Sequence, residues 1–248
     1  ASAINDKTAA ILKVHPSNFR VIGFTHEAGL DELVTLGRER GVPVLNDLGS
    51  GCLLDTTQYG LAPEPTVQQS VDAGVELSFF SGDKLIGGPQ AGIVAGNAEW
   101  VERLGRHPLV RAVRIDKMGL AALSATLTSF LKEKAPEEIP VWRMISLSLD
   151  TITRTAESWL NEIDSPAVGL RDGQSTVGGG SLPGETLATT LLAVTPPDSP
   201  DAFAGRLRSG PTPVIARIEN EVVVLDPRTV LDGQSAAVVE AVKLALNA

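Results

Sequence analysis

The sequence predicts an α/β protein whose first part is a mostly parallel sheet with helices and whose second part is a smaller α+β domain. In the first half, short apolar runs alternate with amphipathic helical patterns, which is typical of a parallel sheet with crossover helices. In the second half, helices alternate with strands that include a hairpin. With 43% apolar residues in 248, the chain can bury one large or two modest cores. We expect one domain over residues 1–118 and a second over 119–248, bridged by a helix at 116–132.

The apolar runs of the first half predict four strands, and we expect the first of them to be buried. Between the first two strands, Leu30, Leu33 and Val34 recur at helical spacing among charged residues, which predicts a helix over 28–40. Gly41 follows as its C-cap. The predicted strands are 9–14, 43–47, 76–80 and 91–95.

The second half contains a different order of elements. Two prolines and two glutamates between Ala135 and Pro140 indicate a linker or hinge. A glycine-rich loop is expected at 178–180, and the hairpin at 214–225 should turn near Asn220. The remaining predicted elements are helices at 98–106, 116–132, 144–163, 201–209 and 234–246 and a strand at 187–194.

Charge and cysteine content exclude several classes of protein. The net charge of −9 and the pI near 4.9 argue against nucleic-acid binding over the whole surface, because phosphate binding needs clustered Lys and Arg. Any RNA contact must therefore be local or lie elsewhere. One cysteine and no apolar run of membrane-spanning length exclude a disulfide scaffold and a transmembrane segment. We expect a cytoplasmic protein.

Lys84 lies in the segment with the strongest chemical signal, SFFSGDKLIGGPQAG at residues 78–92. A predicted strand leads to the lysine, and a glycine-rich loop leads on into the next strand. A partly desolvated lysine amine in such a turn can attack an aldehyde carbon. A solvated lysine in a surface turn is the alternative.

Asp47 ends the preceding predicted strand. Parallel strands bring their carboxyl ends to one edge, where ligands of open α/β sheets bind, so Asp47 and Lys84 should meet in one crevice. Pyridoxal phosphate needs such a pair, because the lysine forms a Schiff base and the carboxylate keeps the pyridine nitrogen protonated. Taken alone, Asp47 could instead be a turn or N-cap residue.

Five blocks of the sequence resemble selenocysteine synthase, the L-seryl-tRNA(Sec) selenium transferase of bacteria, in register over nearly the whole chain. The Lys84 block is also similar to other pyridoxal-phosphate enzymes of fold type I, so it is specific only for the superfamily. The Arg111–Met118 block points to the narrower family. The five blocks are KVHPSN at 13–18, DLGSG at 47–51, SGDKLIGGPQAG at 81–92, RAVRIDKM at 111–118 and GGGSLP at 178–183.

The resemblance implies a role for several residues and a partial fold-type I large domain. Lys84 would hold pyridoxal 5'-phosphate and be the catalytic residue, and Asp47 would pair with the pyridine nitrogen. Ser81 would bind the cofactor phosphate, and Asn18 would donate to the phenolic oxygen. His15 and Asn18 could equally be strand-end residues satisfied by the backbone, and for His15 we favour that reading. No metal is implied.

Arg111 and Arg114 lie in a basic stretch of an acidic chain. From Val101 to Lys117, five Lys or Arg residues accompany two acids. Arginine suits an anion with several oxygens, because its forked donors bind bidentately. By resemblance, Arg111 and Arg114 would hold selenophosphate; a solvated helix face with surface ion pairs is the alternative.

The activity that the resemblance implies is the conversion of seryl-tRNA(Sec) to selenocysteinyl-tRNA(Sec). The seryl group would lose its β-hydroxyl to give an aminoacrylate, and selenium from selenophosphate would add to it. A second hypothesis is a tRNA-independent relative that acts by β-elimination on a small amino acid or amino sugar. A third is that the chain is only a structural and oligomerisation fragment.

The chain lacks an initiator Met and begins almost directly with a strand, so we expect that something upstream has been removed. The family's N-terminal RNA-binding region and the first part of its large domain would then be missing. The resemblance further implies a homo-oligomer built of dimers. We expect the isolated chain to bind the cofactor weakly or not at all, because a partial sheet leaves an incomplete pocket.

Overall fold

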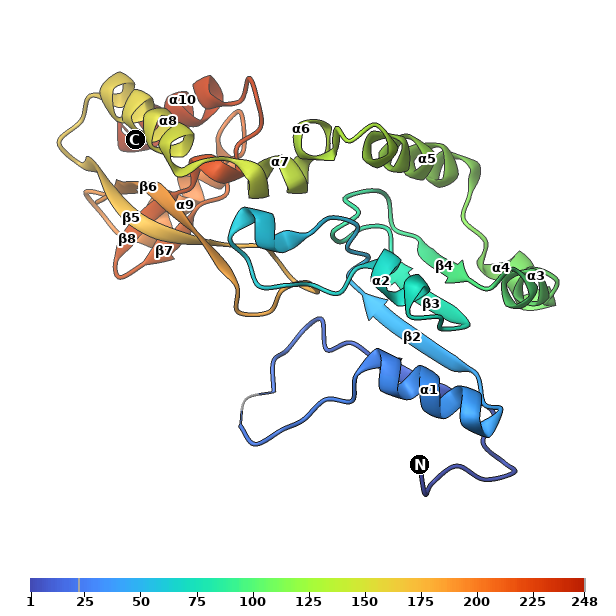
Figure 1. Cartoon of the computed structure of the whole chain (residues 1–248). Helices are drawn as coiled ribbons and strands as arrows, with labels where there is room; N and C mark the ends of the chain where they lie inside the picture. The colour runs from blue at the N-terminus through green and yellow to red at the C-terminus, as the bar shows by residue number, and fades with distance from the viewer. Residues whose placement is uncertain (22, 248) are drawn as a thin grey trace. The chain divides into compact units, whose positions relative to one another are not determined.

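The computed structural model of the chain describes residues 1–21 and 23–247. The chain divides into two compact units (Figure 1). The first unit comprises residues 1–142 and 177–185, and the second comprises residues 143–176 and 186–248. Each unit has its own sheet, so each is described by itself.

The first unit is built on a four-stranded sheet with the strand order β1-β2-β3-β4. β1 (Ile11–Val14), β2 (Val44–Gly49) and β3 (Leu77–Ser81) are parallel, and β4 (Gly92–Gly96) pairs with β3 in the antiparallel direction. The expectation of a mostly parallel sheet is therefore confirmed. The parallel strands bring the residues after Val14, Asp47 and Ser81 to one edge.

Helix α1 (Leu30–Arg40) follows β1 and covers one face of the sheet. Acidic residues in its first turn and arginines in its last turn complement the helix dipole. Gly41 closes the helix in the left-handed region with φ 64°, as its sequence predicts. Val34 of the helix packs against Val44 of β2.

Two short elements lie between β2 and β3. They are the 3-10 helix η1 (Thr56–Tyr59) and α2 (Val67–Asp72). Thr66 caps α2 by accepting a hydrogen bond from the backbone N–H of Gln69. Val67 of α2 packs with Leu48 and Phe80 under the sheet, which makes α2 the crossover that returns the chain to β3.

The first strand is not buried as expected. Leu12 is 59% exposed and Val14 is 56% exposed. Among the described strands, β1 pairs only with β2, so one edge and one face lie open. The apolar run predicts a strand correctly, but the burial of the strand depends on neighbours that the sequence of the strand does not show.

A run of five helices follows β4. The expected linker at 135–140 is helical, because the proline in α6 sits in the first turn, where a missing N–H costs nothing. Leu123 of α5 packs with Phe80 and Ile86 of the first unit. The five helices are α3 (Ala98–Gly105), α4 (Pro108–Val113), α5 (Lys117–Leu131), α6 (Ala135–Glu138) and α7 (Pro140–Ser146).

The division into compact units falls within α7, between Trp142 and Arg143. The sequence places a domain boundary at 118/119, in front of α5. The two differ because α5 packs on the sheet of the first unit, a contact that helical periodicity alone does not reveal. As a boundary between sequence domains, 118/119 stays a prediction.

The second unit is an antiparallel sheet with the strand order β5-β6-β8-β7 and helices packed on it. The helix expected at 144–163 is interrupted, because Ser148 caps a new helix, α8, by accepting from the N–H of Thr151. The elements are α8 (Leu149–Ile163), β5 (Val168–Thr176), β6 (Thr186–Val194), α9 (Pro200–Ser209), β7 (Arg217–Glu219), β8 (Val222–Leu225), η2 (Pro227–Thr229) and α10 (Ser235–Leu246).

Strand β5 is absent from the sequence prediction. Its residues VGLRDGQST combine glycine with polar side chains and so lack the composition of a strand. It forms because all nine of its residues pair with β6. The hairpin turn at Asn220 is confirmed: Asn220 and Glu221 have φ 52° and 61°, as a two-residue turn between antiparallel strands requires.

Candidate active site

The turn that carries Lys84 is fixed on both sides of the lysine. Before the lysine, Gly82 packs against the segment that leads into β4, because a Cβ on Gly82 would be 2.7 Å from the carbonyl oxygen of Pro89. After the lysine, Leu85 and Ile86 are 1% and 0% exposed. The N–H of Leu85 donates to the carbonyl of Ser50 at 3.1 Å. The position of the lysine backbone is therefore set by the residue after β2, by the segment before β4 and by the buried side chains of Leu85 and Ile86.

A tryptophan outside the sheet also holds this turn. The indole Nε1–H of Trp142 donates to the carbonyl oxygen of Leu85 at 2.5 Å, and the ring is fully buried. A buried indole almost always finds such an acceptor. Trp142 thus links α7 to the residue that follows Lys84.

The side chain of Lys84 runs between two glycines, Gly49 at the end of β2 and Gly180 in the loop between β5 and β6. A Cβ on Gly180 would lie 2.8 Å from Cε of Lys84, and a Cβ on Gly49 would lie 3.6 Å from its Nζ. Both glycines have positive φ. A cavity of about 300 Å³ beside the lysine is lined by Asp83, Lys84, Leu85, Gly87, Gly88, Pro140, Val141, Val177, Gly179 and Ser181.

Asp47 lies at the same edge of the sheet as Lys84. It pairs with Val14 of β1 and Phe79 of β3, and its Oδ1 accepts a hydrogen bond from the N–H of Gly49 at 3.1 Å. Since Nζ of Lys84 lies next to Gly49, the structure brings the lysine and the end of β2 together. The convergence expected from strand order is therefore present.

Ser81, predicted to bind the cofactor phosphate, and Asn18, predicted to donate to the phenolic oxygen, follow strands that end at this edge. Ser17 lies there as well. Ser81 ends β3, and its carbonyl oxygen would be 2.7 Å from a Cβ on Gly51. Asn18 is exposed, whereas its neighbour Ser17 is 6% exposed, with its Oγ 2.9 Å from a Cβ position on Gly49. Ser17 is not among the site residues predicted from the sequence, although Ser17 lies in the same KVHPSN block as Asn18.

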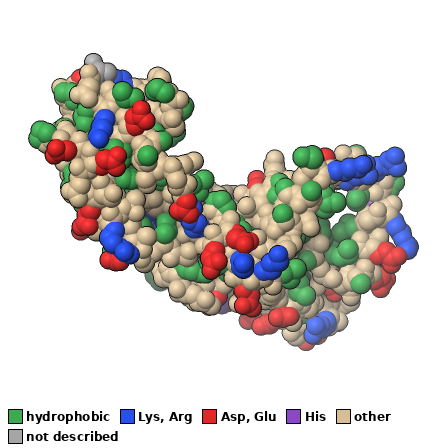
Figure 2. Space-filling model, turned by 90° about the horizontal axis from the view of Figure 1, so that it is seen from above, with side chains coloured by type: hydrophobic (Ala, Val, Ile, Leu, Met, Phe, Trp, Pro, Cys, Tyr) green, Lys and Arg blue, Asp and Glu red, His purple; other side chains and the backbone are tan. Residues whose placement is uncertain are grey.

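Arg111 and Arg114 are not brought to Lys84 by the topology of the chain. β4 runs antiparallel to β3, so it starts opposite Ser81 and ends opposite Leu77. The helices α3 and α4 that follow thus begin at the opposite edge of the sheet. Both arginines are exposed, and the face drawn in Figure 2 shows Lys and Arg side chains interspersed with Asp and Glu.

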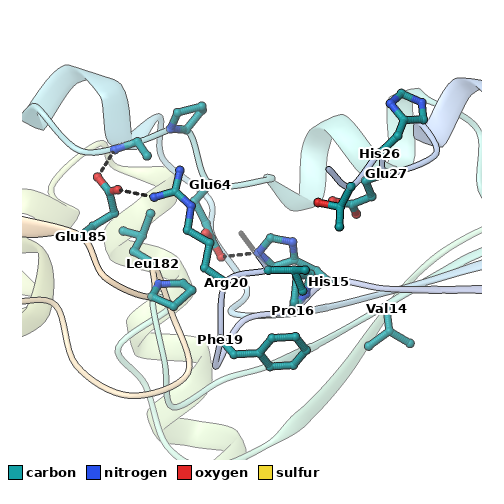
Figure 3. A pocket seen from close by; sticks show the side chains of 15 residues that line it. Val14, His15, Pro16, Phe19, Arg20, His26, Glu27, Glu64, Leu182 and Glu185 are labelled. Carbon is teal, nitrogen blue, oxygen red and sulfur yellow. Dashed lines mark hydrogen bonds and ion pairs between the residues drawn. The ribbon is translucent and has the colours of Figure 1, made fainter. Parts of the chain in front are cut away.

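A larger cavity, of about 570 Å³, opens beside the end of β1. His15 and Glu64 point toward one another within it (Figure 3), with 3.4 Å between Nε2 and Oε1. Their side chains are 18% and 3% exposed. The backbone N–H of His15 donates to the carbonyl of Asp47 at 2.8 Å, so this cavity adjoins the Lys84 edge.

Glu185 joins the loops around the larger cavity. Its Oε2 accepts from the N–H of Ala62 at 2.8 Å, and its Oε1 lies 3.6 Å from Nη1 of Arg20 (Figure 3). Glu185 belongs to the same segment, 177–185, as Gly180. The loop that flanks Lys84 is therefore tied to the wall of the cavity.

Cys52 is not a candidate nucleophile. The thiol is fully buried, and burial raises its pKa to about 12. A nucleophilic cysteine needs an exposed thiolate near positive charge.

Within the described residues, no group of His, Cys, Asp and Glu could hold a metal ion, and no helix there is long and apolar enough to cross a membrane.

The residues at the Lys84 edge suit pyridoxal phosphate. The donor set includes an amine, a carboxylate and hydroxyls, and a side chain at Gly49 or Gly180 would press on Ser17 or Lys84. A lysine and a carboxylate at the carboxyl edge of a parallel sheet are the groups that this cofactor requires. Fold and site together match the class of pyridoxal-phosphate enzymes of fold type I.

Comparison with known proteins narrows the class. The sequence model of one family, described as SelA, L-seryl-tRNA selenium transferase, matches residues 1–231. The chain belongs to this family. The chain is similar in fold to D-glucosaminate-6-phosphate ammonia-lyase, with a TM-score of 0.63 and 20% identity over 99% of this chain and 59% of that one.

Curated relatives carry the same description as the family. The L-seryl-tRNA(Sec) selenium transferase of Nitratidesulfovibrio vulgaris is 48% identical over 99% of this chain and 54% of its own. That of Alkaliphilus metalliredigens is 44% identical over 97% of this chain and 53% of its own. The chain thus spans about half the length of the curated relatives it matches.

Proposed function

We propose that this chain supplies the lysine-bearing part of an enzyme that converts seryl-tRNA(Sec) to selenocysteinyl-tRNA(Sec) with selenophosphate. The observation that carries the proposal is the position of the Lys84 amine, which lies between Gly49 and Gly180 at the edge of the sheet near Asp47, two residues before the end of β2. Family membership supports the choice of substrate, since the relatives are named for seryl-tRNA(Sec). We propose the cytoplasm as the location.

Lys84, Asp47, Ser81 and Asn18 would hold the cofactor in this proposal. When bound, pyridoxal phosphate supplies an electron sink for the bond between Cα and its hydrogen. Nζ of Lys84 would hold the cofactor and would also be the base that takes the Cα proton. The absence of side chains at Gly49 and Gly180 keeps the amine unobstructed for both tasks, since a Cβ on Gly180 would lie 3.1 Å from Nζ.

Asp47 contributes a carboxyl group to the site. Its Oδ1 is held by the N–H of Gly49, which orients the carboxylate toward the edge of the sheet. A carboxylate in that position keeps a pyridine nitrogen protonated. Ser17 acts as a further polar neighbour of the amine, because its hydroxyl lies beside Gly49.

Arg111 and Arg114 act, we propose, in the site of a second copy of the chain. They follow β4 to the edge of the sheet away from Lys84, so one chain does not supply both the lysine and the arginines to one pocket. Exposed guanidinium groups suit an anionic selenium donor. This arrangement requires the homo-oligomer that the family resemblance implies.

Mixing two inactive variants tests this arrangement. Lys84→Ala lacks the amine, and Arg114→Glu repels the donor, so each alone should lose transfer of selenium to seryl-tRNA(Sec). If the sites are shared, a mixture that exchanges subunits should regain about a quarter of the wild-type activity, because mixed dimers hold one intact site. A mixture that stays inactive while the mixed dimers form contradicts shared sites.

A further inference from the structure

The cavity beside β1 has the size and lining of a ligand site. Its volume of about 570 Å³ falls in the range of small-molecule pockets, about 300–1,000 Å³. Pro16, Phe19, Leu182 and Pro183 contribute apolar walls. Walls of this kind with a few converging polar atoms are typical of pockets that bind a flat ring.

Two buried polar atoms in this cavity lack a hydrogen bond. Among the described residues, neither Nε2 of His15 nor Oε1 of Glu64 makes a hydrogen bond, although they lie 3.4 Å apart. The Glu64 side chain is 97% buried, since only 3% of it is exposed. An unpaired buried carboxylate oxygen is costly. A ligand that donates to Glu64 and accepts from His15 would remove this cost.

Three other charged groups that line the cavity, Arg20, Glu27 and Glu185, already have partners. Glu185 is bound by the N–H of Ala62 and lies near Arg20. Glu27 is paired with Lys13. His15 and Glu64 therefore offer a ligand one hydrogen-bond donor and one acceptor that make no other hydrogen bond among the described residues.

We propose that this cavity receives an unpaired nucleobase that carries an exocyclic amine, adenine or cytosine, from the acceptor end of the tRNA substrate. In adenine the N6 amine donates to Oε1 of Glu64 and N1 accepts from Nε2–H of His15. In cytosine the N4 amine and N3 present the same edge. Single-stranded RNA ends are commonly read through this edge, with the base stacked on an aromatic ring such as Phe19.

The position of the cavity agrees with this ligand. A tRNA ends in C-C-A, and the amino acid is attached to the terminal ribose, so a pocket for these bases must lie close to the reacting amine. His15 is hydrogen-bonded to the backbone of Asp47, which places the cavity next to the Lys84 edge. The inference rests on the proposed function, because it takes a charged tRNA as the substrate.

Mononucleotide binding tests the inference without cofactor. AMP and CMP at millimolar concentrations are compared with IMP and UMP, which carry a carbonyl in place of the amine and an N–H in place of the acceptor nitrogen. We expect AMP or CMP to bind at least about tenfold more tightly than its keto counterpart. The preferred pair identifies the base. Equal affinity for amino and keto forms, or no saturable binding, overturns the inference.

Two matched variants assign the selectivity to Glu64. Glu64→Gln keeps the shape of the side chain but removes the charge, and it should abolish the preference of AMP over IMP or CMP over UMP. Glu27→Gln alters another carboxylate of the same cavity and should retain the preference. An unchanged preference in a folded Glu64→Gln protein contradicts the inference. Failure here leaves cofactor trapping on Lys84 unaffected, so the two proposals fail separately.

Discussion

The stem of Lys84 packs against Gly180, and its amine lies near Gly49 at the end of β2. Gly180 leaves no room for a Cβ, since that atom would lie 2.8 Å from Cε and 3.1 Å from Nζ of the lysine. The lysine is flexible and would have to move aside. The path of the amine toward the edge of the sheet thus depends on the absence of a side chain at residue 180.

Gly180→Ala should slow reductive attachment of pyridoxal phosphate to Lys84 by about tenfold or more, because the amine is displaced from its position. Gly60→Ala is the matched control: Gly60 has a similar φ, 77° against 83°, but a Cβ there meets nothing within 4 Å. Each change costs about 1–2 kcal/mol of backbone strain. Equal trapping rates in the two variants would contradict the packing described for Lys84.

Cys52 provides a test of burial in the first unit through pH. Burial raises the pKa of its thiol from 9.0 to about 12, so folding favours the protonated form. The stabilisation is complete below pH 9 and is lost as pH rises from 9 toward 12, by about 1.4 kcal/mol per pH unit. We expect Cys52→Ala to lose less stability than wild type between pH 9 and 10.5 in urea unfolding. Parallel pH profiles would show that the thiol is not buried.

At the residue scale, the sequence predicts the main groups of the site but not all of them. Lys84 and Asp47 are predictable because each follows a recognisable strand. Ser17 and Glu64 are not, because their roles depend on contacts with residues distant in sequence, Gly49 and His15. The proposed roles of Arg111 and Arg114 stay predictions.

At the scale of elements, α7 stabilises the turn that presents Lys84. Trp142 of α7 donates its indole N–H to the carbonyl of Leu85. Trp159 of α8 is equally buried, but among the described residues its Nε1 has no hydrogen-bond partner. Trp142 also contacts the ring of Tyr59, with 5.8 Å between the ring centroids, a contact that a phenylalanine at 142 can keep. The indole hydrogen bond is therefore the polar interaction by which the two tryptophans differ.

Trp142→Phe should lower the free energy of unfolding by about 1–3 kcal/mol more than Trp159→Phe, because it leaves the buried carbonyl of Leu85 without a donor. Urea unfolding of both variants measures the difference. Hydrogen exchange of the Leu85–Gly88 amides should rise in Trp142→Phe alone. If the two variants lose equal stability and these amides stay protected, α7 does not hold the turn.

Elements with a clear period or cap are predicted well, and the others are not. Helix α1 ends at Gly41 and the hairpin turns at Asn220 as expected. Strand β5 was missed because its order comes from pairing with β6 rather than from its own residues. The helical segment at 135–140 was missed because prolines mark helix starts as well as breaks.

At the scale of the whole molecule, the chain combines a mostly parallel sheet with an antiparallel one in two compact units. The class is predictable from the alternation of strands and helices. The exposure of Leu12 and Val14 on β1 is not, because it depends on what lies beyond the strand. The chain spans about half the length of the curated relatives it matches.

Lys84 is, in our proposal, the residue that holds pyridoxal phosphate. Borohydride reduction of the chain with added cofactor, followed by peptide mapping, tests it directly and captures even weak binding. We predict a pyridoxyl group on Lys84 in clear excess over the exposed Lys117, and its loss in Lys84→Ala. Uniform labelling of the lysines, or a retained absorbance band that borohydride bleaches in Lys84→Ala, would contradict the claim.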